Sequence, residues 1–188
     1  PRLIFDGSGP VTLPGASPST EVTTSVSGAL NNFGVPGAKS FHLVAPGYGN
    51  VQGVPLGLAN PYFARMASSP NATVLGDAMA QSPTFFTLSE VGGNDVLGYA
   101  LSGGSGVDQT GNFDPSTYGG SDITDPNVFA QVFSTMVTTL TSGGAKGVVG
   151  NVPYITNLAH FTTVPYNPIE GAAIADQVPL LNQVFGAI

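Results

Sequence analysis

Between residues 84 and 152 the chain reads as a strand, a helix and a second strand, and this order constrains the fold more than any other feature. The stretch 83–88 is rich in β-forming residues and bounded by turn residues. After Asp125-Pro126 an amphipathic helix runs to a Gly143-Gly144 stop. Its apolar face comprises Val128, Phe129, Val132, Phe133, Met136, Val137 and Leu140. The apolar run 147–152 follows, so we predict two parallel buried strands joined by a right-handed crossover, and hence an α/β fold.

The other elements have weaker signals. Residues 2–5 predict a short strand that Asp6-Gly7-Ser8-Gly9-Pro10 ends, with mostly coil to about residue 25. Residues 31–37 are typical of a strand edge running into a glycine turn, and 38–45 of a short helix. Further along we expect a Gly/Pro loop at 47–60, helices at 61–68, 73–80 and 96–101, a loop at 153–168, and a last helix at 170–188 that Pro179 kinks or restarts.

Composition narrows the class of protein. At 188 residues there is room for one domain, 1–188, with a real core, and 26 Gly and 16 Pro predict many loops and turns. The net charge of −7, with no cluster of Lys or Arg, argues against a nucleic-acid partner. The absence of Cys excludes disulfides and thiolate metal sites. Few Lys and many Thr, Ser, Gly and Asn favour an extracytoplasmic bacterial protein.

Two turns are candidates for chemistry. In open α/β sheets ligands bind beyond the carboxyl ends of the strands. Gly37 ends one predicted strand and turn, and Gly92-Gly93-Asn94-Asp95 follows the strand at 84–88. Ester hydrolysis needs fixed donors around a tetrahedral oxyanion, which a glycine N–H and an Asn amide can supply. The alternative for the second turn is an Asx-type turn that caps the following helix.

These residues resemble two blocks of the SGNH, or GDSL-like, hydrolases. Asn32 to Gly37 is similar to the second block of that family, and Gly92, Gly93, Asn94 and Asp95 match the third, Gly-x-Asn-Asp. The resemblance implies a three-layer α/β/α sandwich with a flavodoxin-like, mainly parallel sheet. It also implies a lipase or esterase acting on a small ester, a lipid or an acylated sugar. Gly37 N–H and the Asn94 side chain would form the oxyanion hole, with Gly92, Gly93 and Asp95 as the supporting turn.

The likeness extends over about 31–168, a stretch that resembles GDSL-like lipoproteins of Bacteroidetes-type bacteria. It implies a secreted protein of the periplasm, outer membrane or cell surface. The family's first block, Gly-Asp-Ser-Leu, has no match, since Asp6-Gly7-Ser8 has another order, and neither His42 nor His160 lies three residues after an Asp. We expect both histidines to be hydrogen-bonded packing residues. The two missing motifs are the first and the last of the family's four blocks along the chain. We therefore expect a fragment whose fold is incomplete at both ends.

Two functions therefore stay open. The first is an ester hydrolase whose nucleophilic serine lies outside this chain, and which needs no cofactor or metal. The alternative is a non-catalytic envelope protein that binds or assembles with partner proteins of an outer-membrane complex.

Two local features of the sequence have more than one interpretation. The polar loop 102–124 is longer than most connections, which is usual for functional or mobile segments. Within it, oxygen-bearing side chains occupy alternate positions, as they do in a calcium loop: Asp108, Thr110, Asn112 and Asp114. Phe113 stands at the sixth position, where a calcium loop needs glycine, so we favour a solvated insertion. A buried, unpaired Glu90 would be costly. We therefore expect either that Glu90 faces the cleft of the candidate site or that the preceding strand ends at Leu88.

Overall fold

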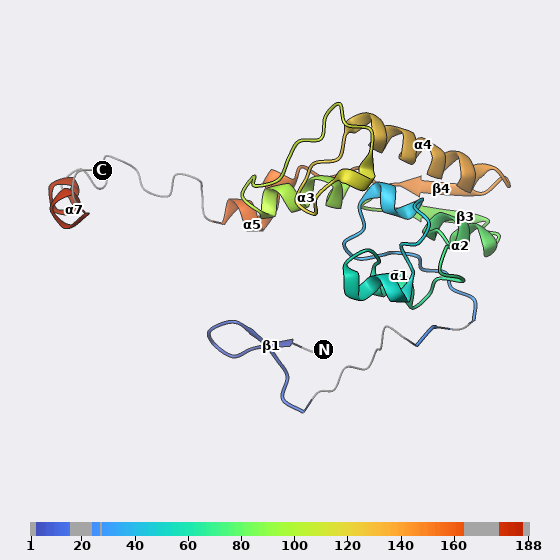
Figure 1. Ribbon diagram of the computed structural model, residues 1–188, viewed down its shortest axis with the longest axis horizontal. Helices are drawn as coiled ribbons and strands as arrows, with labels where there is room; N and C mark the ends of the chain where they lie inside the picture. The colour runs from blue at the N-terminus through green and yellow to red at the C-terminus, as the bar shows by residue number, and fades with distance from the viewer. Residues whose placement is uncertain (1–2, 16–23, 27, 164–176, 186–188) are drawn as a thin grey trace. The chain divides into compact units, whose positions relative to one another are not determined.

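The structure is a computed structural model that describes residues 3–15, 24–26, 28–163 and 177–185 (Figure 1). The chain divides into two units, Pro1–Val152 and Pro153–Ile188. Every element that concerns the candidate site belongs to the first unit.

A parallel pair of strands forms the central sheet of the first unit. Strand β3 (Phe85–Leu88) pairs with β4 (Lys146–Val149), with Phe85 opposite Lys146 and Leu88 opposite Val149. Helices α3 (Gly93–Leu101) and α4 (Pro126–Thr141) lie in the connection between the two strands. The predicted strand, helix and strand are therefore confirmed as a mixed α/β arrangement. The expected burial is wrong, because Phe85 is 59% and Val148 58% exposed.

Helix α4 forms where the sequence predicts it, because both its cap and its apolar face are encoded locally. The Asp125 side chain accepts hydrogen bonds from the backbone N–H groups of Asn127 and Val128, and Pro126 occupies the first turn. Of the predicted apolar face, Val128, Met136 and Leu140 are buried. Burying large apolar side chains contributes about 1.5–3 kcal/mol each.

Shorter helices surround this frame. They are the 3₁₀ helices η1 (Ser40–Leu43), η2 (Val51–Leu56) and η3 (Pro115–Thr117), and the α-helices α1 (Pro61–Ala64) and α2 (Val74–Ala80). The caps at Asn60 and Thr73 confirm the predicted starts of α1 and α2. Helix α1 ends at Ala64, earlier than expected, and the expected loop 47–60 contains η2.

Two further predictions need correction in this unit. Residues 31–37 form no strand, since their backbone finds no partner strand in the described part of the chain. Helix α3 begins at Gly93 rather than at 96, because Gly92 turns the chain with a φ of 103°.

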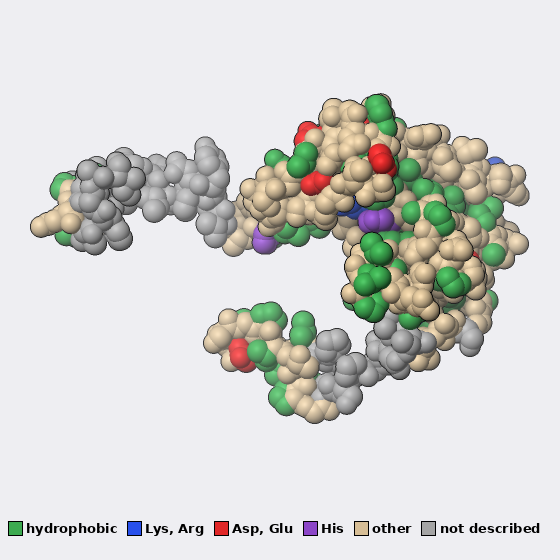
Figure 2. Space-filling view, viewed as in Figure 1, with side chains coloured by type: hydrophobic (Ala, Val, Ile, Leu, Met, Phe, Trp, Pro, Cys, Tyr) green, Lys and Arg blue, Asp and Glu red, His purple; other side chains and the backbone are tan. Residues whose placement is uncertain are grey.

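The N-terminal segment folds into a hairpin rather than a strand followed by coil. Strand β1 (Leu3–Phe5) pairs antiparallel with β2 (Pro10–Thr12). The Asp6 carboxylate accepts hydrogen bonds from the N–H groups of Ser8 and Gly9, so residues that were expected to end the strand instead close a turn. Figure 2 shows apolar side chains at several places on this hairpin, and Phe5 is 73% exposed.

The second unit has short helices in its described part. These are η4 (Ile155–Asn157), α5 (Ala159–Thr162) and α7 (Val178–Phe185). The prediction of a loop at 153–168 is wrong where η4 and α5 form. For the helix expected at 170–188, residues 170–176 and 186–188 lie outside the described residues, and Pro179 stands second in α7, at a new start. In the described residues no helix has both the length and the apolar character to cross a membrane.

Candidate active site

Gly37 stands at an exposed turn of the first unit. Its φ of 78° lies in the left-handed region, which glycine adopts without strain. The preceding carbonyl, of Pro36, accepts a hydrogen bond from Asn60 Nδ2 at 2.9 Å, which fixes the approach to the corner. Among the described residues the Gly37 N–H has no hydrogen-bond partner. It is therefore a free donor at an exposed turn.

Asn94 approaches the same corner from the first turn of α3. Its Nδ2 donates to the carbonyl of Ala38 at 2.9 Å, across 56 positions of sequence. A primary amide has two N–H groups, so one remains for another acceptor. The side chain is half-buried. The structure thus brings the two predicted donors, Gly37 and Asn94, to neighbouring positions.

The glycines before Asn94 allow this approach. A Cβ on Gly92 would lie 2.7 Å from Val152 Cγ2 and 2.8 Å from Phe129 Cε2, so no larger residue fits there. The N–H of Gly93 donates to the carbonyl of Glu90 at 3.0 Å and closes the turn. Gly92 therefore packs the start of α3 against its neighbours, and Gly93 has open space around it.

Asp95 joins α3 to the segment after Gly37. Its carboxylate accepts a hydrogen bond from Ser40 N at 2.9 Å and one from Ser40 Oγ at 2.7 Å. Asp95 is 2% and Ser40 1% exposed, so both contacts lie inside the protein. Hydrogen bonds to a buried carboxylate are among the stronger ones in proteins. Asp95 therefore holds residues 37–40 beside Asn94.

Lys39 makes a contact for which no sequence pattern provides a signal. Its ammonium donates to the carbonyls of Gly119 at 3.1 Å and Asp122 at 2.7 Å, some 80 positions away. Lys39 is buried, and burial lowers the pKa of its ammonium below the ordinary value. A hydrogen-bonded lysine in an otherwise apolar stretch cannot be distinguished by sequence from a solvated one. Lys39 ties the long loop to the segment that carries Gly37.

The loop at 102–124 is largely exposed, as expected for a solvated insertion, and internal hydrogen bonds also hold it in place. The Asp122 carboxylate accepts hydrogen bonds from Val107 N at 2.9 Å, Gln109 Nε2 at 2.6 Å and Gly119 N at 2.7 Å. These bonds, the one with the Val107 N–H first, hold the pKa of Asp122 below its usual range. Asp125 adds a bond from Gly111 N at 2.8 Å.

The alternating oxygen-bearing residues at 108–114, which resemble a calcium loop, close successive turns of the backbone. Asp108 Oδ1 accepts from Thr110 N at 3.0 Å, and Asn112 Oδ1 accepts from Asp114 N at 3.1 Å. Side-chain oxygens thus bind the backbone two residues ahead. Within the described residues no three His, Cys, Asp or Glu side chains group where they could hold a metal ion.

His42 is a hydrogen-bonded packing residue, as predicted. Its Nδ1 accepts from Lys39 N at 3.1 Å, and its ring stacks on Tyr48 at a centroid distance of 4.3 Å. Burial, reinforced by the Lys39 charge, lowers the pKa of His42 to about 4. For His160 the same prediction is wrong: the side chain is exposed and, in the part of the chain that is described, contacts the Phe161 ring edge-on without a hydrogen bond.

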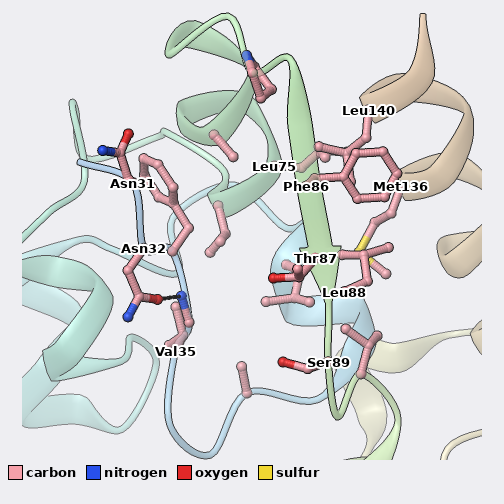
Figure 3. A pocket seen from close by; sticks show the side chains of 18 of the residues that line it. Asn31, Asn32, Val35, Leu75, Phe86, Thr87, Leu88, Ser89, Met136 and Leu140 are labelled. Atoms are coloured by element: carbon pink, nitrogen blue, oxygen red, sulfur yellow. Dashed lines mark hydrogen bonds between the residues drawn. The ribbon is translucent and has the colours of Figure 1, made fainter. Parts of the chain in front are cut away.

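A cavity of about 1040 Å³ adjoins the two donors. Figure 3 shows part of its lining, with Asn31 and Asn32 on one side and Phe86 and Leu88 on the other. The cavity lies between residues 30–38 and the 83–91 stretch that contains β3, and side chains of α2 and α4 line it as well. Gly37, Asn94 and Glu90 all border it. Glu90 is exposed, with a φ of 63°, and β3 ends at Leu88. Both expectations are therefore met: Glu90 borders the cavity, and the strand ends before it.

The chain matches no protein-family model, no curated protein and no solved structure.

Proposed function

We propose that this chain is the oxyanion-binding part of an extracytoplasmic ester hydrolase of the SGNH type, with a three-layer α/β/α fold. The observation that carries the proposal is the hydrogen bond from Asn94 Nδ2 to the carbonyl of Ala38 at 2.9 Å. It sets the Asn94 amide beside the corner at Gly37, where a backbone N–H is free among the described residues. Two uncharged donors from distant parts of the chain thus border one cavity.

The chemistry suited to this pair is stabilisation of a tetrahedral oxyanion. The free N–H of Gly37 and the second N–H of Asn94 would donate to the oxyanion as an ester carbonyl is attacked. Asp95 and Gly92 hold the donors in place, and fixed donors need no reorganisation during the reaction. A serine outside this chain would form the acyl-enzyme, which water then hydrolyses. The substrate is a small ester, a lipid or an acylated sugar, and no cofactor or metal is required.

A second candidate is a non-catalytic binding or assembly subunit of a bacterial outer-membrane complex, working with partner proteins. It is favoured by the lack of a Ser–His pair in the described residues. Ser40 Oγ is buried against Asp95, and His42 Nδ1 accepts from the Lys39 backbone. Neither side chain is arranged as a nucleophile or a base.

The test uses the chain and a longer polypeptide that contains it. Each is incubated with a short-chain nitrophenyl ester and with a serine-reactive phosphonate, and labelled serines are located by mass spectrometry. We expect turnover and labelling only in a form that supplies the nucleophile. In that form Asn94→Ala should lower kcat about 10²–10³-fold. Asn31→Ala, which changes an exposed amide at the same cavity, is the control and should leave kcat unchanged. No turnover and no labelling in any form would favour the binding subunit.

A further inference from the structure

A second, smaller pocket lies in the first unit, apart from the cavity at Gly37 and Asn94. It has a volume of about 290 Å³, and its lining comes from the segments 42–48 and 57–61. Among the described residues it shares none of its lining with the larger cavity. One water molecule takes up about 30 Å³ in the liquid, so this space equals that of about ten waters. The pocket is therefore of the size that suits a small molecule.

His42 offers a hydrogen-bond donor at this pocket. Its Nδ1 accepts from Lys39 N at 3.1 Å, and a pKa of about 4 keeps the ring neutral at pH 7. A neutral imidazole has one N–H, so the proton is on Nε2. Within the described chain Nε2 has no hydrogen-bond partner, and it is not among the atoms shut off from solvent. The charges of Lys39 and Asp95 act on the ring in opposite directions.

The Tyr48 hydroxyl is a second donor. Its ring stacks on His42 with 4.3 Å between the ring centroids and 9° between the ring planes. The hydroxyl oxygen accepts from Asn60 Nδ2 at 3.1 Å, so the hydroxyl proton is left for another acceptor. Burial raises the pKa of Tyr48, so the hydroxyl keeps this proton at pH 7. Tyr48, Asn60 and His42 all line the pocket, which thus has two neutral donors on stacked rings.

The rest of the lining determines which ligands fit. Within the described residues it contains no Lys, Arg, Asp or Glu, and it is completed by Gly57 and by apolar side chains, of which Pro46 and Leu58 are the largest. A charged ligand would lose its hydration here without an ion partner, which is costly. The lining has one side-chain carbonyl, Asn60 Oδ1, and it already accepts from Tyr62 N at 2.8 Å and Phe63 N at 3.3 Å. The pocket therefore matches an uncharged molecule that accepts hydrogen bonds.

We propose that this pocket binds a small uncharged carbonyl compound, an amide or a ketone, whose oxygen accepts from the Tyr48 hydroxyl beside the His42 Nε2–H. A carbonyl oxygen accepts hydrogen bonds and brings no donor that would need a partner. The apolar body of the ligand packs against Pro46 and Leu58. This site does not depend on the proposed ester hydrolysis, because it is built from other residues.

The first experiment titrates the full chain with N-methylpyrrolidone, a small cyclic tertiary amide, at pH 7. NMR follows the protein signals, and intermolecular NOEs locate the ligand. We expect saturable binding with a Kd of about 1–10 mM, as for a ligand of this size, and NOEs to the ring protons of His42 and Tyr48. N-methylpyrrolidine has the same ring as a cation without the carbonyl, and cyclopentanecarboxylate is an anion of similar size. Each should bind at least about tenfold more weakly.

A conservative variant tests the hydroxyl. Tyr48→Phe keeps the ring that stacks on His42 but removes the O–H, and should weaken binding of N-methylpyrrolidone at least about threefold. Tyr62→Phe removes an exposed hydroxyl outside the lining and is the matched control, with unchanged binding. The amide signals of α4 report whether each variant is folded.

The proposal is overturned if NOEs to His42 and Tyr48 are absent at about 50 mM ligand. It is also overturned if either charged analogue binds as tightly as N-methylpyrrolidone, or if folded Tyr48→Phe binds it unchanged. The comparison of analogues uses the unchanged chain, so it decides the question even where Tyr48→Phe does not fold.

Discussion

Gly92 and Gly93 are adjacent residues whose replacement should have opposite effects on stability. In Gly92→Ala the new Cβ meets Val152 Cγ2 at 2.7 Å in a backbone with a φ of 103°. We expect a loss of about 2–4 kcal/mol from backbone strain and overpacking together. Gly93→Ala, where the Cβ meets nothing within 4 Å, should be neutral or stabilising by up to about 1 kcal/mol. Urea unfolding measures both, and equal losses would show that the turn is built differently.

His42 should make the stability of the chain depend on pH. Its pKa is lowered from 6.5 to about 4 in the folded protein, mainly by burial. Between these values the unfolded chain binds a proton that the folded chain does not, so stability falls as the pH falls from 6.5 to 4. The slope from one such group reaches at most about 1.4 kcal/mol per pH unit.

The measurement is urea unfolding at a series of pH values. His42→Gln retains an acceptor for the Lys39 N–H but does not titrate, so this part of the slope should disappear. His160→Gln, which changes an exposed ring, is the matched control and should retain the slope. An unchanged slope in His42→Gln would assign the dependence to other groups.

At the level of elements, Asp125 links the start of α4 to the long loop. It is fully buried and accepts hydrogen bonds from the N–H groups of Gly111, Asn127 and Val128. Asp125→Ala removes a helix cap and leaves buried donors without a partner, for an expected loss of about 2–4 kcal/mol. Asp125→Asn keeps one acceptor and should lose less. The exposed cap Asp114 is the control: Asp114→Ala should cost under about 1 kcal/mol in the same unfolding measurement.

Elements with a local signal were the predictable ones. Helices α1, α2 and α4 are capped by Asn60, Thr73 and Asp125, and each cap is a side chain that accepts a hydrogen bond from at least one N–H group two or three residues ahead. The hairpin turn at Asp6 also has a local cause, but turn residues in a sequence indicate that a strand ends and not that the chain reverses to pair with it. Residues 31–37 have a strand-like composition, yet a strand exists only with a partner, and composition does not supply one.

At the level of the whole molecule, the contacts that build the site join distant residues. Asn94 meets Ala38 across 56 positions, and Lys39 meets Asp122 across 83. The pairing of Gly37 with Asn94 was inferred from a family resemblance, because no periodicity connects the two turns. Nothing in the sequence pointed to Lys39, since the acceptors are backbone carbonyls, which every residue has.

Lys39 holds the long loop, residues 102–124, against the segment that carries Gly37. Lys39→Met keeps the length and apolar stem of the side chain but removes the donors to Gly119 and Asp122. Global stability should change by less than about 2 kcal/mol, because removing a buried charge offsets part of the lost hydrogen bonding. The loop itself should open more often. We therefore expect amide exchange at Asp122 and Ile123 to rise at least about tenfold, whereas exchange in α4 follows the small global change.

Lys146→Met alters an exposed lysine of β4 and is the control, for which loop exchange should be unchanged. Equal exchange in the two variants would mean that the Asp122 carboxylate, with its bonds to Val107, Gln109 and Gly119, holds the loop without Lys39.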